Sequence, residues 1–437
     1  MEQTTIPAPH APLSWVDKTA AVFLGLAVTT VAFGPALVGV FLGLAALIIL
    51  PRFVQRRLWA RIPADFGKSL GLAIIATFAW WLVCSLVSID PGRAFSTWAR
   101  TVGLVFLAYS ITHFLACDRR LIDWFLKAVI VAGMPILLYL VAIGFVDVGF
   151  IALMEWVKGH SLDAGLFGKG FRSVISCILP VMVWAAFRLR GGWRILAVVM
   201  VVLSGLAIYA GDAQMSRSAV AGVAAGLAAV LLLVAFRPLP QVARRAIVVI
   251  GIVAVTVGGL VFLDKLPRPP MTGRELARVM PLPDAHRQVI WGFAEDQVKK
   301  RPVFGTGMNT INLTPEAQKR HHPFRWLENK SGETVKTVLD LEYLPSHPHN
   351  WVLEVAAENG VPGLVLMLAA ILLLLGRFMQ AAYSGARAGW VAFVVTAVFF
   401  VGSLANFSFW SVWWQASFLI FLAVAWAAAR QEVGRPS

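Results

Sequence analysis

Charged side chains are scarce in this sequence. Asp, Glu, Lys and Arg make up 14% of the 437 residues, against 59% hydrophobic residues and a mean hydropathy of +0.75. A soluble globular domain carries about 25% charged residues. The composition therefore excludes a soluble globular protein and predicts one that crosses a membrane many times.

Cysteines are few, and the sequence lacks metal-binding patterns. Cys84, Cys117 and Cys177 fall within or at the ends of apolar runs, which indicates packing and excludes a disulfide framework. His321 and His322 are adjacent but have no third ligand at a useful spacing, and no Asp-x-Asp pair occurs. We therefore expect a protein that needs neither a metal nor another cofactor.

A cleavable signal pattern is also missing, because the N-terminus is polar and the first apolar run, from Ala20, is long enough to span. That run continues to Leu50, and Phe33-Gly34-Pro35 divides it into two spans. Further spans are expected near 69–87, 97–117, 121–145, 172–189, 193–211, 217–236, 244–263, 350–376, 387–404 and 409–429. The sequence thus predicts an all-α polytopic membrane protein with about twelve transmembrane helices.

The net charge of +15 does not indicate a nucleic acid partner, because the basic residues cluster in short loops between apolar runs. If the N-terminus is cytoplasmic, half of the 38 Lys and Arg residues fall in the cytoplasmic termini and loops. The positive-inside rule then predicts cytoplasmic termini in a bacterial inner membrane, surrounded by membrane lipids. Three regions follow: 1–263 with spans 1–9, a periplasmic segment 264–349 with short helices, and 350–437 with spans 10–12.

The stretch Ser346-His347-Pro348-His349-Asn350-Trp351-Val352-Leu353-Glu354 stands where the polar segment ends and an apolar run resumes. It predicts two histidines at the membrane surface, on the first turn of a spanning helix. Histidine titrates near neutrality, so it can take a proton from a reacting group and return it. The plainer alternative is that both histidines only cap the helix. Glu354 and Glu358 either orient the histidine or favour the helix N-terminus.

Arginines are expected at the same depth as His349. Arg100, Arg172 and Arg217 lie near the outward ends of spans. A single interfacial arginine usually reaches toward lipid phosphate, but several at one depth can form an anion site, because guanidinium matches phosphate oxygens. Arg287 lies in an expected helix capped by Asp284, on the same face as a tryptophan. The basic, aromatic stretch from Lys319 to Trp326 could grip an anion or form a solvated face.

Three of these motifs resemble the O-antigen ligase family. They are HPHN-x2-LE-x3-ENG-x2-G from His347, the pattern R-x3-W from Arg287 followed by Pro302-Val303-Phe304-Gly305-Thr306-Gly307, and Ser216-Arg217-Ser218 at the start of a span. The family includes lipopolysaccharide ligases, O-antigen polymerases and bacterial protein O-oligosaccharyltransferases.

The resemblance implies a GT-C-like glycosyltransferase that moves a glycan from undecaprenyl diphosphate to a sugar hydroxyl of the lipid A–core oligosaccharide. It implies His349 as general base, with His347 second, Asn350 and Glu354 in support, and Arg217 and Arg287, with Arg172 and Arg100, holding the diphosphate. Direct attack by the hydroxyl would invert the anomeric centre, without a metal.

Other functions remain open at this point. A polymerase would use a growing lipid-linked chain as acceptor, but the single large outer segment favours a ligase. A protein O-oligosaccharyltransferase usually carries a further C-terminal region, whereas few residues follow the last span here. A transporter of lipid-linked glycans would place its ionisable residues and broken helices near the midplane, often in inverted repeats, and the sequence concentrates its polar groups at one surface.

Overall fold

The expected spans all form helices in the computed structural model, which describes residues 12–145, 169–209, 213–276, 280, 282–328 and 333–433. Within these residues, twelve helices are long and apolar enough to cross a membrane. They are α1 (Trp15–Thr29, extended by a 3-10 turn), α2 (Pro35–Gln55), α4 (Ser69–Leu86), α5 (Pro91–Ala116), α6 (Arg119–Phe145), α8 (Lys169–Arg188), α9 (Gly192–Tyr209), α10 (Ala213–Phe236), α11 (Gln241–Asp264), α13 (Trp351–Tyr383), α14 (Arg387–Gly402) and α15 (Val412–Val433). The all-α polytopic class is confirmed.

Turn residues separate the helices where the sequence breaks its apolar runs. Gly34 has a φ of 143°, and Pro35 begins α2 immediately after it, because proline fits the first turn of a helix but not its interior. Asp90 caps α5 by accepting the Arg93 N–H at 3.0 Å, and Pro91 takes the first helical position. A short helix, α3 (Ile62–Phe66), joins α2 to α4.

The helices pack around an apolar core made largely by α1, α5, α6, α8, α14 and α15. Its fully buried aromatic side chains include Phe114, Phe125, Phe171, Phe399 and Phe421. Helix α11 differs, because none of its residues is buried. Side-chain contacts hold it near its ends: the Phe262 and Trp291 rings lie 6.3 Å apart, and the Arg244 guanidinium lies 5.3 Å from the Tyr383 ring.

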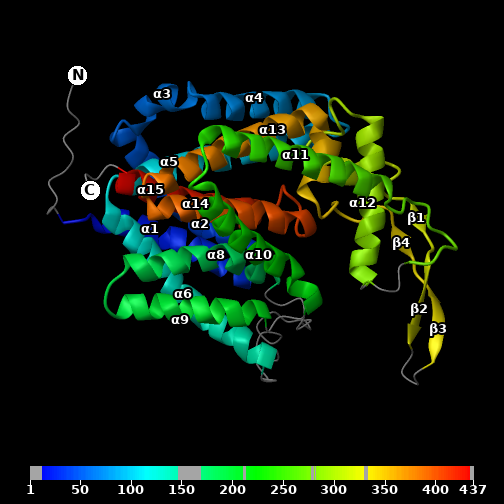
Figure 1. The fold of residues 1–437 in the computed structure, drawn as a ribbon, viewed down its shortest axis with the longest axis horizontal. Coiled ribbons are helices and arrows are strands. Elements are labelled where there is room, and N and C mark those ends of the chain that lie inside the picture. The colour runs from blue at the N-terminus through cyan, green and yellow to red at the C-terminus, as the bar shows by residue number, and fades with distance from the viewer. Residues whose placement is uncertain are drawn as a thin grey trace.

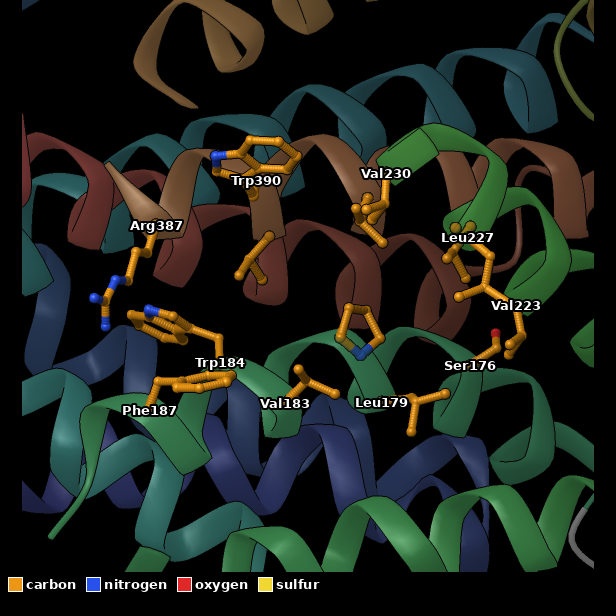
Figure 2. A pocket seen from close by; sticks show the side chains of 15 residues that line it. Ser176, Leu179, Val183, Trp184, Phe187, Val223, Leu227, Val230, Arg387 and Trp390 are labelled. Carbon is orange, nitrogen blue, oxygen red and sulfur yellow. The ribbon is translucent and has the colours of Figure 1, made fainter. Parts of the chain in front are cut away.

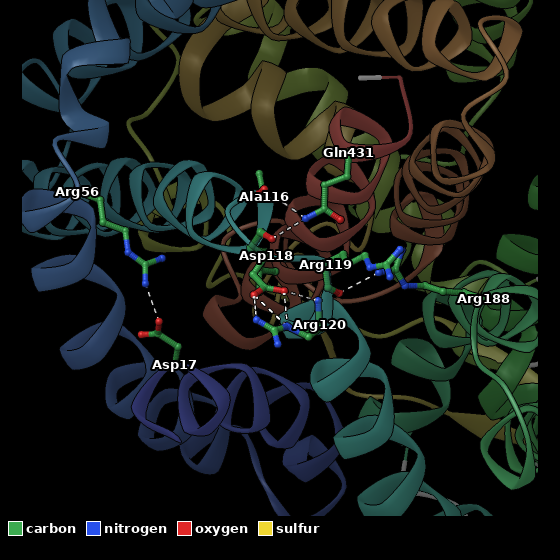
Figure 3. A network of polar contacts seen from close by, with 9 residues as sticks. Asp17, Arg56, Ala116, Asp118, Arg119, Arg120, Arg188 and Gln431 are labelled. Carbon is green, nitrogen blue, oxygen red and sulfur yellow. Dashed lines mark hydrogen bonds and ion pairs between the residues drawn. The ribbon is translucent and has the colours of Figure 1, made fainter. Parts of the chain in front are cut away.

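A polar network ties the helices together at the end of the bundle where α1 begins and α15 ends (Figures 1 and 3). Asp17 of α1 accepts from Arg56 after α2 at 2.6 Å, and Arg188 of α8 donates to the backbone carbonyl of Arg119 at 2.9 Å. Gln431 of α15 donates to backbone carbonyls at the end of α5. We call this the chain-end side of the bundle.

Segment 264–349 lies at the opposite end, which we call the loop side (Figure 1). It contains α12 (Leu282–Lys300), a 3-10 turn (Ile311–Leu313), and the strands β1 (Arg320–His321), β2 (Phe324–Glu328), β3 (Thr334–Val338) and β4 (Leu341–Glu342). β1 pairs with β4 and β2 with β3, both antiparallel. Buried Ile290 and Phe293 of α12 pack in one cluster with Leu353 of α13, so the segment sits directly on the start of that spanning helix.

Helix α13 is interrupted at Gly360, whose φ of 71° lies in the left-handed region. Pro362 has no N–H for the Glu358 carbonyl four residues earlier, and the Gly307 N–H donates to that carbonyl at 2.8 Å instead. The Thr306 N–H similarly binds the Ala357 carbonyl at 3.0 Å. The loop 302–307 thus replaces the hydrogen bonds that the helix loses, which gives the E-N-G-x2-G motif a structural explanation.

Gly360→Ala is expected to lower the free energy of unfolding by about 3 kcal/mol, because a backbone conformation that only glycine adopts readily and overpacking each cost about 1–3 kcal/mol. An added Cβ would stand 1.8 Å from the Val303 carbonyl oxygen. Gly376→Ala in the same helix is the matched control, because its Cβ would meet no atom within 4 Å. Thermal unfolding in detergent measures both, and equal melting temperatures would contradict the expectation.

Candidate active site

The histidine motif forms a loop that leads into α13. Asn350 is the N-cap: its Oδ1 accepts from the backbone N–H groups of Val352 at 3.1 Å and Leu353 at 3.3 Å. His349 precedes the cap with a φ of 56°. The expectation that the histidines lie on the first helical turn is therefore wrong by a few residues, because the asparagine side chain takes the capping position after them.

The imidazole of His349 has a defined orientation. Its Nδ1 lies 2.7 Å from the backbone carbonyl oxygen of Asn406, in the loop between α14 and α15. A carbonyl only accepts hydrogen bonds, so the neutral ring carries its proton on Nδ1 and its lone pair on Nε2. The His347 ring lies 4.0 Å away between centroids, tilted by 49°. The structure therefore fixes the tautomer that a general base acting through Nε2 requires.

Glu354 of α13 is buried and holds the loop that supplies the Asn406 carbonyl. One carboxylate oxygen accepts from the Ser408 hydroxyl at 2.5 Å, and the other accepts from the Phe409 N–H at 2.7 Å. The sequence left two roles open for Glu354, orientation of the histidine or stabilisation of the helix N-terminus. These contacts match the first, because Glu354 holds the loop whose Asn406 carbonyl contacts His349.

Glu358, one turn further along α13, is buried among other hydrogen-bond donors. Its carboxylate accepts from the N–H groups of Asn309 at 2.6 Å and Ile311 at 3.1 Å, and from the indole of Trp410. It thereby ties segment 264–349 to the loop between α14 and α15. The sequence interpretation assigned no role to Trp410, which it placed at the start of the apolar run 409–429.

Arg217 and Arg287 meet at one carboxylate. Arg217, at the loop-side end of α10, and Arg287 of α12 both form ion pairs with Asp284, the latter at 3.1 Å. Asp284 was expected to be the N-cap of its helix, but α12 begins earlier, at Leu282, so the carboxylate lies in the first turn and faces the arginines. The two arginines predicted to act together are thus adjacent in the structure.

A chain of contacts links the arginine pair to His349. Trp291 lies one helical turn after Arg287 and donates its indole N–H to the Pro348 carbonyl at 2.8 Å. Asn406, whose backbone carbonyl contacts the His349 ring, donates its side-chain N–H to the Ser173 hydroxyl at 2.9 Å. Arg172, the residue before Ser173, is buried in the first turn of α8. Three of the four predicted arginines therefore belong to one continuous group around His349.

Arg100 occupies a different position. Its guanidinium donates to the backbone carbonyl of Trp410 at 3.1 Å, so it contacts the loop between α14 and α15 from α5. Arg100 is therefore linked to the residues around His349 through Trp410 and Glu358, without contacting His349 itself. This position matches a supporting role better than diphosphate binding.

The basic stretch at 319–326 is neutralised within the segment itself. Arg320 pairs with Asp340 at 2.7 Å and Glu342 at 3.0 Å, and the Lys336 ammonium lies 4.2 Å from the Phe324 ring. Arg325 donates to the Met280 carbonyl. These contacts favour a structural, solvated face over a grip on an anion.

His321 makes the stability of this segment sensitive to acid. Burial, with His286 and His322 nearby, lowers its pKa from 6.5 to about 4. The unfolded chain therefore binds a proton that the folded protein does not, and the free energy of unfolding should fall as the pH drops from 6.5 to 4, by about 1.4 kcal/mol per pH unit.

The measurement is the melting temperature across that pH range. His321→Gln should flatten the slope, because glutamine does not titrate. Its amide oxygen can still accept from the Met271 N–H, as the His321 Nδ1 does at 3.3 Å, which preserves this contact. His322→Gln is the matched comparison at a side chain that is 54% exposed, and it should change the slope less than His321→Gln does. Identical slopes in all three proteins would contradict the assignment.

An apolar groove of about 450 Å³ runs between α8, α10 and α14 (Figure 2). Arg387 and Trp390 line it toward the chain-end side, and Ser176 lines its other end. The Ser176 hydroxyl donates to the Ser173 carbonyl at 2.6 Å, which brings this end close to the His349 group. A second cavity of about 280 Å³ shares part of its wall and reaches Val220, one helical turn from Arg217.

These features define a class: a polytopic membrane protein with a histidine and arginine site at one end of its bundle, beside an apolar groove. Comparison with known families agrees. Residues 202–368 match the family model described as O-antigen ligase, a range that includes Arg217, Arg287 and His349. The match over this region confirms the resemblance to the O-antigen ligase family seen in the sequence, and the architecture is GT-C-like.

Similar proteins carry a compatible description. A candidate polysaccharide ligase of Rickettsia felis is 22% identical over 345 residues, which cover 78% of this chain and 75% of that protein. One from Rickettsia typhi is 22% identical over the same share of this chain and 76% of its own length. One from Rickettsia bellii is 26% identical over 133 residues, 30% of this chain and 29% of that protein. The comparisons support a polysaccharide ligase activity at family level.

Proposed function

We propose that this protein is an O-antigen ligase that transfers O-antigen polysaccharide from undecaprenyl diphosphate to a sugar hydroxyl of the lipid A–core oligosaccharide. The observation that carries the proposal is His349, whose Nδ1 contacts the Asn406 carbonyl at 2.7 Å in the same contact chain as the Arg217–Arg287 pair. Such a site combines a proton acceptor with fixed cations, as transfer from a diphosphate requires.

The reaction proceeds in one displacement. The acceptor hydroxyl attacks the anomeric carbon of the donor as its proton passes to Nε2 of His349. The bond between that carbon and the diphosphate oxygen breaks, and undecaprenyl diphosphate leaves with the electron pair. Attack from the face opposite the leaving group inverts the anomeric configuration. General base catalysis of this kind contributes about 10²- to 10⁴-fold to a rate.

The arginines stabilise the departing diphosphate. A guanidinium has five N–H donors, so Arg217 and Arg287 can each keep a bond to Asp284 and offer further donors to phosphate oxygens. Asp284 holds the two forks in place before the donor arrives, and fixed donors need no reorganisation when charge develops. Arg172 is the third candidate contact, and no metal takes part in the proposed step.

The apolar groove suits the prenyl tail of a lipid-linked donor. It lies in the membrane-spanning part of the bundle, and the second cavity brings its wall to within one turn of Arg217. We place the site at the periplasmic face of the bacterial inner membrane, with both termini cytoplasmic. The arginines at the chain-end side, including Arg56 and Arg188, support that orientation by the positive-inside rule.

A reconstituted transfer assay tests the proposal. Purified protein in vesicles receives a glycan on undecaprenyl diphosphate, with lipid A–core as acceptor and EDTA present. The expected product is glycan on lipid A–core. A longer glycan still on its diphosphate lipid would instead identify a polymerase, and glycan on an added acceptor protein would identify a protein O-oligosaccharyltransferase. Movement of the intact donor across the vesicle membrane, without transfer, would identify a transporter.

A further inference from the structure

We infer that Asn406 is a positioning residue of this enzyme, which sets the tautomer of His349 and couples that ring to the start of α8. The inference rests on the proposed function, in which His349 is the base. Asn406 was not among the residues that the sequence singled out, and it lies outside the region 202–368 that matches the family model.

Asn406 uses its backbone and its side chain in different directions. The backbone carbonyl lies 2.7 Å from His349 Nδ1, and the side-chain amide donates to the Ser173 hydroxyl at 2.9 Å. The residue is only 4% exposed, so both groups are shielded from water. A buried polar side chain held in this way anchors the backbone that carries it, and here that backbone carries the partner of the base.

The loop around Asn406 is fixed on both sides. Before it, the Trp414 indole donates to the Ser403 hydroxyl at 2.8 Å. After it, Glu354 accepts from Ser408 and Phe409. Among the described residues, the side-chain bond to Ser173 ties Asn406 and its carbonyl to α8.

The position of this carbonyl matters to the proposed reaction in two ways. It keeps the proton on Nδ1, so that the lone pair of the neutral ring is on Nε2. It also accepts from a ring that becomes positively charged when Nε2 takes the acceptor's proton, and a hydrogen bond to a charged group is stronger than one to a neutral group. Asn406 therefore favours both the reactive tautomer and the protonated product of the step.

The bond to Ser173 adds a link to donor binding. Ser173 follows Arg172, and its own carbonyl accepts from Ser176 at the end of the apolar groove. The groove is thus connected to the base through three hydrogen bonds, from Ser176 to Ser173, from Asn406 to Ser173 and between His349 and Asn406. The class of ligand this coupling senses is an anionic, diphosphate-bearing lipid.

The test compares Asn406→Ala with Ser403→Ala in the transfer assay. Asn406→Ala should lower kcat about 10- to 100-fold, the size of effect that follows loss of the partner orienting a metal-bound histidine, with KM for the donor changed less. The acid-side midpoint of the kcat/KM profile should move to lower pH, because the backbone carbonyl, which alanine retains, is no longer anchored to Ser173 and stabilises the imidazolium less well. Ser403→Ala removes a bond from the same loop without touching His349, and should keep the wild-type kcat and midpoint.

Ser173→Ala is a milder version of the same change. It should lower kcat in the same direction, and the double variant should be no slower than Asn406→Ala alone, because both remove one bond. In a His349→Ala background, Asn406→Ala should have no further effect on the residual rate. Additive losses, or a wild-type kcat and pH midpoint in Asn406→Ala, would overturn the inference, as would equal losses in Ser403→Ala.

A second measurement needs no turnover. The ¹⁵N chemical shifts of labelled histidine should show His349 protonated on Nδ1 in the wild-type protein and in Ser403→Ala, and a mixture of tautomers in Asn406→Ala. An unchanged tautomer would overturn the inference even if the protein proved not to be a ligase. Conversely, an active wild type, an inactive His349→Ala and an unaffected Asn406→Ala would leave the proposed function standing and remove only Asn406.

Discussion

His349→Ala is expected to reduce glycan transfer at least about a hundredfold while leaving the protein folded, because a positioned general base contributes about 10²- to 10⁴-fold. The imidazole is only partly buried and precedes the helix rather than forming part of its core. Its removal therefore eliminates the proposed proton acceptor but few packing contacts. The reconstituted assay measures the rate, and the melting temperature measures the fold.

His347→Ala is the matched comparison for that variant. His347 lies beside His349, with ring centroids 4.0 Å apart, and contacts the Ser346 hydroxyl at 3.0 Å rather than the Asn406 carbonyl. Its loss should slow transfer much less. Full activity in His349→Ala would remove that residue from the mechanism, and a larger loss in His347→Ala would exchange the two roles.

Arg217→Lys should lower the transfer rate about a hundredfold or more, as removal of a fixed donor to a developing negative charge does. Lysine keeps the positive charge but lacks the planar fork, so it cannot bind Asp284 and a phosphate oxygen in the same geometry. Arg287→Lys should behave similarly, because it contacts the same carboxylate at 3.1 Å. Donor turnover at saturating acceptor is the quantity to measure.

Arg320→Lys serves as the control for the arginine variants. Arg320 also forms two ion pairs, with Asp340 and Glu342, but it belongs to the exposed strands of segment 264–349. Its replacement should leave transfer unchanged. If Arg217→Lys retained wild-type activity, a simple positive charge at that position would suffice, and the proposed simultaneous contact of the guanidinium with Asp284 and a phosphate oxygen would be wrong.

The helical framework was predictable because it depends on local properties. The length and hydropathy of each apolar run predicted the twelve spans, and Gly34 with Pro35 predicted the first break. The short strands were not predicted: β1 and β4 have two residues each, too few to show an alternating pattern. Their pairing depends on contacts between residues about twenty positions apart, which periodicity does not report.

The site was predictable only in part, for a related reason. His349 and the arginines belong to motifs, so their residue types and spacing indicated them. Asp284 was placed at a helix cap because its local sequence favours that role, but its contact with Arg217 spans 67 positions. Asn406 acts on His349 mainly through a backbone carbonyl, and a carbonyl is common to every residue, so no sequence pattern distinguishes it.

The interruption of α13 has a consequence for attempts to divide this protein. The N–H groups of Thr306 and Gly307 bind carbonyls of Ala357 and Glu358, so the loop side completes a spanning helix rather than resting on it. Segment 264–349 expressed alone would leave those donors without their acceptors, and α13 without the loop would expose carbonyls inside the bilayer. A soluble fragment cut at the surface of the membrane would therefore not preserve either half, and the two must be studied as one unit.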